Sequence, residues 1–357
     1  MTLTPERTLP VFSVGDRSWS VDDVIVAAHF RGELDGWWKE VLQWGAGESR
    51  GKDPGGGDEA AQQSAIEQFR YERDLITAEE TERWLEARGL TLDDFSDYFV
   101  RHSQRPRLVG EVPAIPSAYS EPTARQRDLL RIELLLSGGM EAMAVGLSWR
   151  LAALDRNGAG ISSELIESER ARFFQRTGLG ATDVAHWVAC TQRDERWLEE
   201  MLACEAAYQM EAGRVLTNEQ RERLLHELRI PLTRVEVEIL EVESLAAARE
   251  ATLCVREDGA CLEEMARQGG YPHRREEVLI ENFPPELQRR ILCAAPGEVL
   301  EPIPQGDGFC LWRAMAKTEP ELADAGIRAR VERQLLERHF SDLAARCVRW
   351  QPGFAPP

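Results

Sequence analysis

Residues 284–317, PPELQRRILCAAPGEVLEPIPQGDGFCLWRAMAK, decide the fold of the C-terminal part of the chain. The apolar spacing in PPELQRRILCA predicts a helix that begins at the two prolines, and Pro296-Gly297 predicts the turn after it. VLEPIP and GFCLWRAMAK predict two short strands, separated by the turn residues QGDG. A helix combined with short strands in this order indicates an α+β domain.

The residues before this stretch extend the same domain. TRVEVEILEVES, at 233–244, alternates apolar Val235, Val237 and Ile239 with glutamates, which predicts a strand with one face in water. LAAAREATLCVREDG and ACLEEMARQ predict two helices, the second ending at Gly269-Gly270. We therefore place an α+β domain at residues 234–317.

The N-terminal half is mainly helical. After a short strand and the Gly15-Asp16 turn, Ser20 begins a helix, and Thr77 with Glu80 has the spacing of a capping box. Four prolines in 106–122 predict an extended connector. We therefore expect an N-terminal helical module with a short strand at residues 1–110.

Residues 121–230 repeat the outline of this first module. Four positions align at a separation of about a hundred residues, and they are Phe69 with Phe173, Leu75 with Leu179, Trp84 with Trp187, and Phe95 with Trp197. The match predicts a duplicated helical module; chance similarity of amphipathic helices is the alternative. The chain ends with a predicted amphipathic helix at residues 318–350.

The charge balance limits the classes of partner. Lys and Arg number 43 against 62 Asp and Glu, a formal net charge of -19, which argues against binding nucleic acid or an anionic membrane surface. The first residues contain no basic region followed by an apolar one, and no apolar run approaches the length of a membrane span. We therefore expect a cytoplasmic location.

Metal and cofactor chemistry find no support in the sequence. The seven cysteines are scattered without a CxxC motif, and the six histidines show no HxxxH or HExxH spacing. We expect reduced thiols, no metal and no cofactor.

The element order over 234–317, with its double glycine, the PPEL helix, the PGEV turn and the final strand that begins Gly308-Phe309, resembles the parvulin-type peptidyl-prolyl isomerase domain. With the helical modules before it and the helix after it, the chain resembles the SurA and PrsA class of parvulin-related chaperones. That resemblance implies a helical lobe, completed by the C-terminal helix, which holds polypeptide clients.

The parvulin active-site pattern mostly fails in this chain. The resemblance places a histidine before Ile239-Leu240 and another after Gly308-Phe309, where this sequence has Glu238 and Cys310. A buried carboxylate is unsuited to a neutral imidazole network, so we expect little or no isomerase activity. An apolar peptide-binding pocket could survive around a small set of residues, namely Phe283, Leu287, Phe309 and Leu311.

A second candidate surface lies in the helical lobe. Trp37, Trp38 and Trp44 precede a Gly-rich segment and are candidates for binding an extended peptide. The sequence thus predicts a peptide-binding chaperone or scaffold, with an active or repurposed prolyl isomerase as the alternative. Similarity to cytoplasmic family members implies a precursor-peptide client, a role in maturing a ribosomally made peptide, and a peptide-modifying enzyme as a further partner. The oligomeric state stays open.

Overall fold

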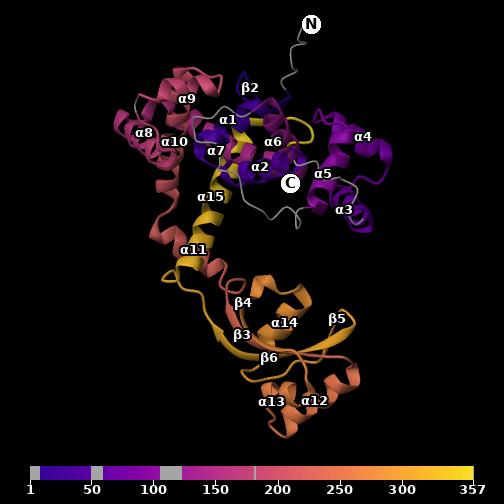
Figure 1. The fold of residues 1–357 in the computed structure, drawn as a ribbon. Coiled ribbons are helices and arrows are strands. Elements are labelled where there is room, and N and C mark those ends of the chain that lie inside the picture. Colours follow the sequence, from indigo (N-terminus) through magenta and orange to yellow (C-terminus); the bar gives the residue numbers. More distant parts are fainter. Residues whose placement is uncertain (1–8, 50–58, 105–122, 181, 357) are drawn as a thin grey trace. The chain divides into compact units, whose positions relative to one another are not determined.

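The computed structural model describes residues 9–49, 59–104, 123–180 and 182–356, which form two compact units (Figure 1). The first unit comprises residues 1–213 and 339–357, and the second comprises 214–338. The fold class is α+β, as predicted: the first unit is mainly helical, and the second is built around an antiparallel sheet. In the described part of the chain, no helix has the length and apolar character that crossing a membrane requires.

A small sheet in the first unit brings the two ends of the chain together. Strands β1 (Pro10–Val14), β2 (Arg17–Ser20) and β7 (Val348–Trp350) are antiparallel, in the order β2-β1-β7. Helix α1 (Val21–Arg31) begins at Ser20, whose side chain accepts a hydrogen bond from the backbone of Asp23, as the sequence predicts. Strands β2 and β7 were not predicted.

After α1, the helical unit continues with one helix, a group of three helices, a linking pair and a second group of three. These helices are α2 (Asp35–Ser49), α3 (Glu59–Glu72), α4 (Ala78–Glu86), α5 (Leu92–Gln104), α6 (Ala124–Ser137), α7 (Gly139–Asn157), α8 (Ser163–Thr177), α9 (Val184–Cys190) and α10 (Glu195–Val215). The prolines at 106–122 lie outside the described residues.

The aromatic core supports the predicted duplication of α3–α5 in α8–α10. Phe69 meets Trp84 edge-on, with ring centroids 5.5 Å apart, and Phe173 meets Trp187 in the same way at 5.1 Å. The pairs occupy matching helices, so the two copies use corresponding rings to anchor short helices.

The backbone adds a second, independent match between the copies. Asp74 and Gln192 are the non-glycine residues with positive φ in the described chain, at 55° and 56°. Each aligns with a glycine of the other copy that is also left-handed, Asp74 with Gly178 and Gln192 with Gly89. A non-glycine residue adopts this conformation only where the local fold demands it. The same two turns therefore occur in both copies.

The C-terminal helix returns to the helical unit, as predicted. Helix α15 (Ala325–Cys347) buries Phe340, whose ring stacks on Tyr208 at a centroid distance of 4.4 Å. His339 Nε2 lies 3.0 Å from Oε2 of the buried Glu211. These contacts involve helices α10 and α15.

The second unit surrounds a four-stranded antiparallel sheet in the order β4-β3-β6-β5. Its elements are α11 (Asn218–Glu227), β3 (Arg234–Val242), α12 (Leu245–Glu257), α13 (Leu262–Gly269), β4 (His273–Leu279), α14 (Pro285–Cys293), β5 (Ile303–Gln305) and β6 (Gly308–Thr318). Helix α14 packs on one face of the sheet, and α12 and α13 pack on the other.

Candidate functional site

The register of β3 and β6 separates the two residues that stand at the predicted active-site positions. Glu238 pairs with Arg313, while Cys310 pairs with Glu241. Directly paired residues share a face of the sheet, and residues three apart on one strand point to opposite faces. Glu238 therefore lies on the α12–α13 face and Cys310 on the α14 face, so they do not form one centre.

Glu238 is fully buried, with two arginines and a histidine beside its carboxylate. Its Oε1 accepts a hydrogen bond from Arg275 Nη2 at 3.1 Å and lies 3.1 Å from His273 Nε2. Arg313 Nη1 lies 3.5 Å from Oε2, and the hydrogen bond to Glu238 raises the pKa of Arg275. The prediction that the glutamates of β3 face water is therefore wrong for Glu238, because α12 and α13 cover this face of the sheet.

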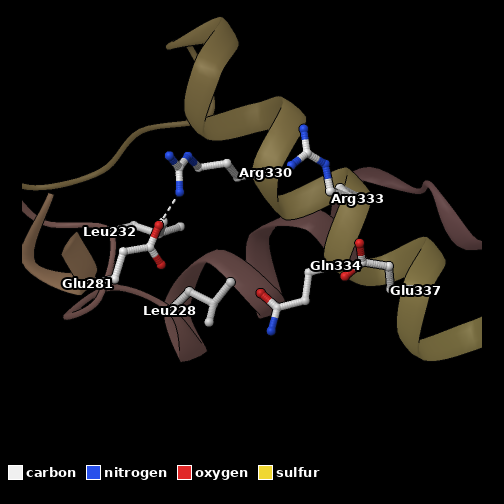
Figure 2. A pocket seen from close by; sticks show the side chains of 7 residues that line it. All are labelled: Leu228, Leu232, Glu281, Arg330, Arg333, Gln334 and Glu337. Atoms are coloured by element: carbon white, nitrogen blue, oxygen red, sulfur yellow. Dashed lines mark hydrogen bonds and ion pairs between the residues drawn. The ribbon is translucent and has the colours of Figure 1, made fainter. Parts of the chain in front are cut away.

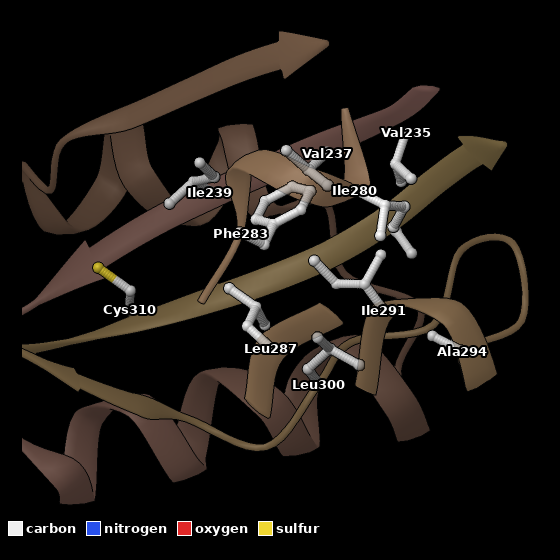
Figure 3. Close-up of a cluster of buried hydrophobic side chains, with 11 residues drawn as sticks. Val235, Val237, Ile239, Ile280, Phe283, Leu287, Ile291, Ala294, Leu300 and Cys310 are labelled. Carbon is white, nitrogen blue, oxygen red and sulfur yellow. The ribbon is translucent and has the colours of Figure 1, made fainter. Parts of the chain in front are cut away.

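Cys310 sits in an apolar cluster on the opposite face (Figure 3). Its thiol donates a hydrogen bond to Gln305 Oε1 at 2.9 Å, and burial raises the pKa of the thiol, with Glu241 adding to the shift. A protonated, hydrogen-bonded thiol is a poor nucleophile. We therefore interpret Cys310 as a small buried residue of the core and not as a nucleophile.

The four residues predicted to line one peptide pocket are also divided between the faces. Phe283 and Leu287 belong to the cluster that contains Cys310, whereas Leu311 and Phe309 belong to the cluster under α12 and α13. Phe283 packs edge-on against Trp312, with ring centroids 5.7 Å apart. The sheet thus prevents these four side chains from lining a single pocket.

The tryptophans of α2 differ in exposure. Trp44 is buried, with its ring 5.5 Å from that of His102, so it is not a surface residue as the sequence led us to expect. Trp37 and Trp38 are half-buried. The ring of Trp37 lies against Gly139, where an added Cβ would come within 2.8 Å of it.

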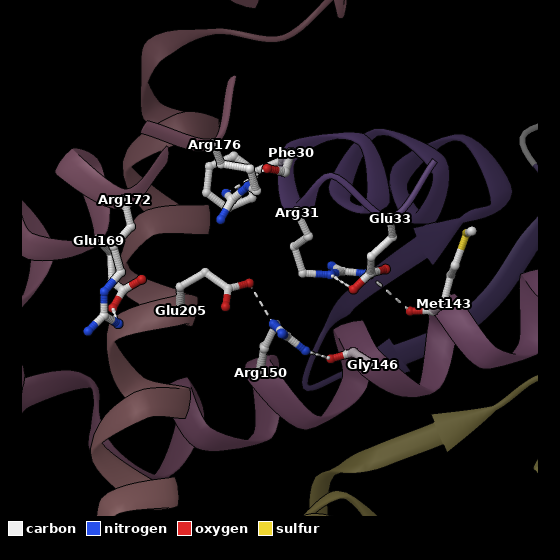
Figure 4. A network of polar contacts seen from close by, with 10 residues as sticks. All are labelled: Phe30, Arg31, Glu33, Met143, Gly146, Arg150, Glu169, Arg172, Arg176 and Glu205. Carbon is white, nitrogen blue, oxygen red and sulfur yellow. Dashed lines mark hydrogen bonds and ion pairs between the residues drawn. The ribbon is translucent and has the colours of Figure 1, made fainter. Parts of the chain in front are cut away.

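Several arginines of the helical unit form hydrogen bonds or ion pairs with other residues of the same unit (Figure 4). Arg150 Nε donates to Glu205 Oε1 at 2.5 Å, joining α7 to α10. Arg176 Nη2 donates to the carbonyl oxygen of Phe30 at 2.8 Å, joining α8 to α1. The network fixes the second helical copy against its neighbours.

A cavity of about 160 Å³ lies in the second unit, between α15 and the residues that follow α11 (Figure 2). Leu228 and Leu232 form its apolar side, and the ion pair of Arg330 with Glu281 borders it. None of the residues predicted to bind peptide lines this cavity. Among the described residues, no group of three or more potential ligands is placed to hold a metal ion.

The fold is that of an α+β protein whose helical unit contains a duplicated module. No protein-family model matches the chain, and no curated protein matches it significantly. Among solved structures, the peptidylprolyl isomerase PrsA of Bacillus cereus aligns with a TM-score of 0.37 and 13% identity, over 61% of this chain and 85% of that one.

Two further structures belong to the same class of neighbour. PrsA of Bacillus subtilis aligns with a TM-score of 0.21 and 15% identity, over 62% of this chain and 84% of that one. A SurA-like chaperone of Campylobacter jejuni has a TM-score of 0.21 and 9% identity, over 62% and 88%.

Proposed function

We propose that the chain binds polypeptides as a chaperone or scaffold and does not catalyse prolyl isomerisation. The observation that carries this proposal is the separation of Glu238 from Cys310 by the sheet, together with the ion pairs that occupy Glu238. The parvulin resemblance implies a polar centre at these two positions. A carboxylate on one face and a protonated thiol on the other cannot act together on one prolyl bond.

The barrier that an isomerase must lower supports the same proposal. Rotation about a peptide bond costs about 18–20 kcal/mol, and lowering this barrier calls for hydrogen-bonding groups aimed at the twisted amide. On the α14 face, Cys310 is surrounded by Ile239, Phe283 and Leu287, which offer apolar packing. Prolyl isomerisation by an active or repurposed site is therefore the alternative, and we do not favour it.

The polypeptide-binding part rests on the resemblance to SurA and PrsA chaperones and on the half-buried Trp37 and Trp38. We further propose a cytoplasmic role in maturing a ribosomally made peptide, with a peptide-modifying enzyme as partner. Affinity purification of the tagged full chain from its own host tests that role. Recovery of such an enzyme or its precursor peptide supports it, and recovery of neither from an expressing culture contradicts it.

Suppression of aggregation tests the chaperone proposal. The full chain is added in equimolar amount to citrate synthase at a temperature at which the client aggregates, and light scattering is followed. We expect scattering to fall severalfold, and to fall equally with the Cys310→Ala variant, because Cys310 has no part in binding. Undiminished scattering at a tenfold excess of the chain contradicts the proposal.

A further inference from the structure

The residues that follow β7 lie against the first helical copy. The N–H of Gln351 donates to the carbonyl of Val11 at 2.9 Å, which prolongs the pairing of β7 with β1. Phe354 is only 1% exposed, although the residues on either side of it are exposed. The segment 351–356 is therefore anchored mainly by one buried aromatic ring.

Arg88, in the turn between α4 and α5, binds this segment. Its Nη2 donates to the carbonyl oxygen of Gly353, and its guanidinium carbon lies 5.2 Å from the centroid of the Phe354 ring. The same carbon lies 3.7 Å from the centroid of the Trp84 ring. The other acceptors of the guanidinium, the carbonyl of Trp84 and Oε1 of Glu141, are 3.5 and 3.4 Å away. Together Trp84, Arg88 and Glu141 form what we call the Phe354 site.

The chemistry of the Phe354 site does not depend on which chain fills it. Arg88 is 4% exposed, and its Nε has no hydrogen-bond partner among the described residues. Displacing the segment removes an acceptor from this buried cation, which favours another carbonyl oxygen in its place. Any main-chain carbonyl can accept this bond, and a phenylalanine ring beside the guanidinium gains the cation–π contact. Segments of other polypeptides can therefore meet both requirements.

Gly353 indicates which segments fit. Its φ is 88°, in the left-handed region, and a Cβ added there would come within 3.1 Å of Arg88 Nη1. Both observations favour glycine directly before the buried ring. The site therefore selects a Gly-Phe pair.

The second helical copy has a different residue at the position of Arg88. The corresponding residue is Thr191, which likewise stands one position before the left-handed turn residue of its copy. Its hydroxyl donates to the carbonyl of Val188 at 2.8 Å, within the same turn. The module therefore folds without an arginine at this position, which leaves Arg88 available for binding.

We propose that the Phe354 site takes up Gly-Phe segments of client polypeptides, and that residues 351–356 compete with the client for it. This inference rests on the proposed polypeptide-binding function and names the class of segment and its internal competitor. A competitor that is docked for about nine-tenths of the time lowers the apparent affinity for a client about tenfold. Removing the ring of Phe354 should therefore raise the affinity for a client by about this factor.

Fluorine NMR of short peptides tests the inference on the full chain. One probe is a serine-rich peptide with a central Gly-Phe pair and a fluorine on its Phe ring, and a second probe has Val in place of this Gly. Affinities are measured for the parent and for Phe354→Ala. The matched control is Tyr71→Ala, which removes an 84% exposed aromatic ring from the same helical copy. A chain that ends after Gln351 opens the site by a second route if Phe354→Ala folds poorly.

We expect Phe354→Ala to bind the Gly-Phe peptide about tenfold more tightly than the parent does, and Tyr71→Ala to match the parent. Adding Arg88→Leu to Phe354→Ala should abolish the gain, and the Val-Phe peptide should gain little. Equal affinity of the parent and both opened chains overturns the inference, and the proposed function then stands if the parent suppresses aggregation. Failure of the parent and the opened chains to bind either peptide or to suppress aggregation overturns the proposed function as well.

Discussion

Replacing Glu238 with glutamine should loosen the second unit, because Glu238 neutralises the cations around it. The side chain is fully buried, and it contacts His273, Arg275 and Arg313. Removing one member of a fully buried ion pair costs about 3–5 kcal/mol. Arg275 is 51% exposed at its side chain, so water can solvate part of the charge that the substitution leaves unpaired. We therefore expect a smaller loss, about 1–3 kcal/mol.

Hydrogen exchange of the full chain measures this loss locally. A change of 1–3 kcal/mol corresponds to amide exchange about 5- to 150-fold faster in β3 and β6. The matched control is Glu236→Gln, two residues along the same strand and exposed, which should leave exchange unchanged. Equal protection in Glu238→Gln and the parent would refute the structural role assigned to Glu238.

Three further outcomes follow from single residues. Phe340→Ala should destabilise the helical unit to urea by about 3–5 kcal/mol, because its buried ring stacks on Tyr208; a loss below 1 kcal/mol would contradict the observed packing. Burial lowers the pKa of His29 below 6.5, so the unfolded chain takes up this proton first and stability is lost as the pH falls below that value. Between pH 7.5 and 5.5, His29→Asn should therefore lose less unfolding free energy than the parent in urea titrations, and an equal loss would argue against it. Iodoacetamide at pH 8 should label the exposed Cys293 well before Cys310, as peptide mass spectrometry can determine, since burial raises the pKa of Cys310; equal labelling would count against a buried thiol.

Patterns that depend on near neighbours in sequence were predictable. The capping residues Ser20 and Thr77 begin helices as expected, and Phe340 of the predicted C-terminal helix is buried in the helical unit, where its ring stacks on Tyr208. The short strand β7 was missed because it follows a strong helical pattern directly. Its partner β1 lies at the opposite end of the chain, and no local signal connects them.

The site was less predictable because it depends on register. A shift of one residue moves a side chain to the other face of a sheet. Residues of β3 are buried on both faces, as Ile239 and Leu240 show, so the alternation of apolar and charged residues did not mark which face holds α14. The position of Trp44 was also wrongly predicted, because we expected its ring at the surface. Helix α2 continues to Ser49 and carries this ring inward.

Exchange NMR on a proline-containing peptide tests the central claim most directly, because one sample reports both binding and isomerisation. The peptide contains Leu and Phe residues and one Ala-Pro bond, whose uncatalysed isomerisation takes tens to hundreds of seconds. With a tenth of an equivalent of the full chain, we predict broadened peptide resonances and no cis–trans exchange peaks. Exchange peaks with a rate above 1 per second, lost in Cys310→Ala, would contradict a polypeptide-binding protein without isomerase chemistry.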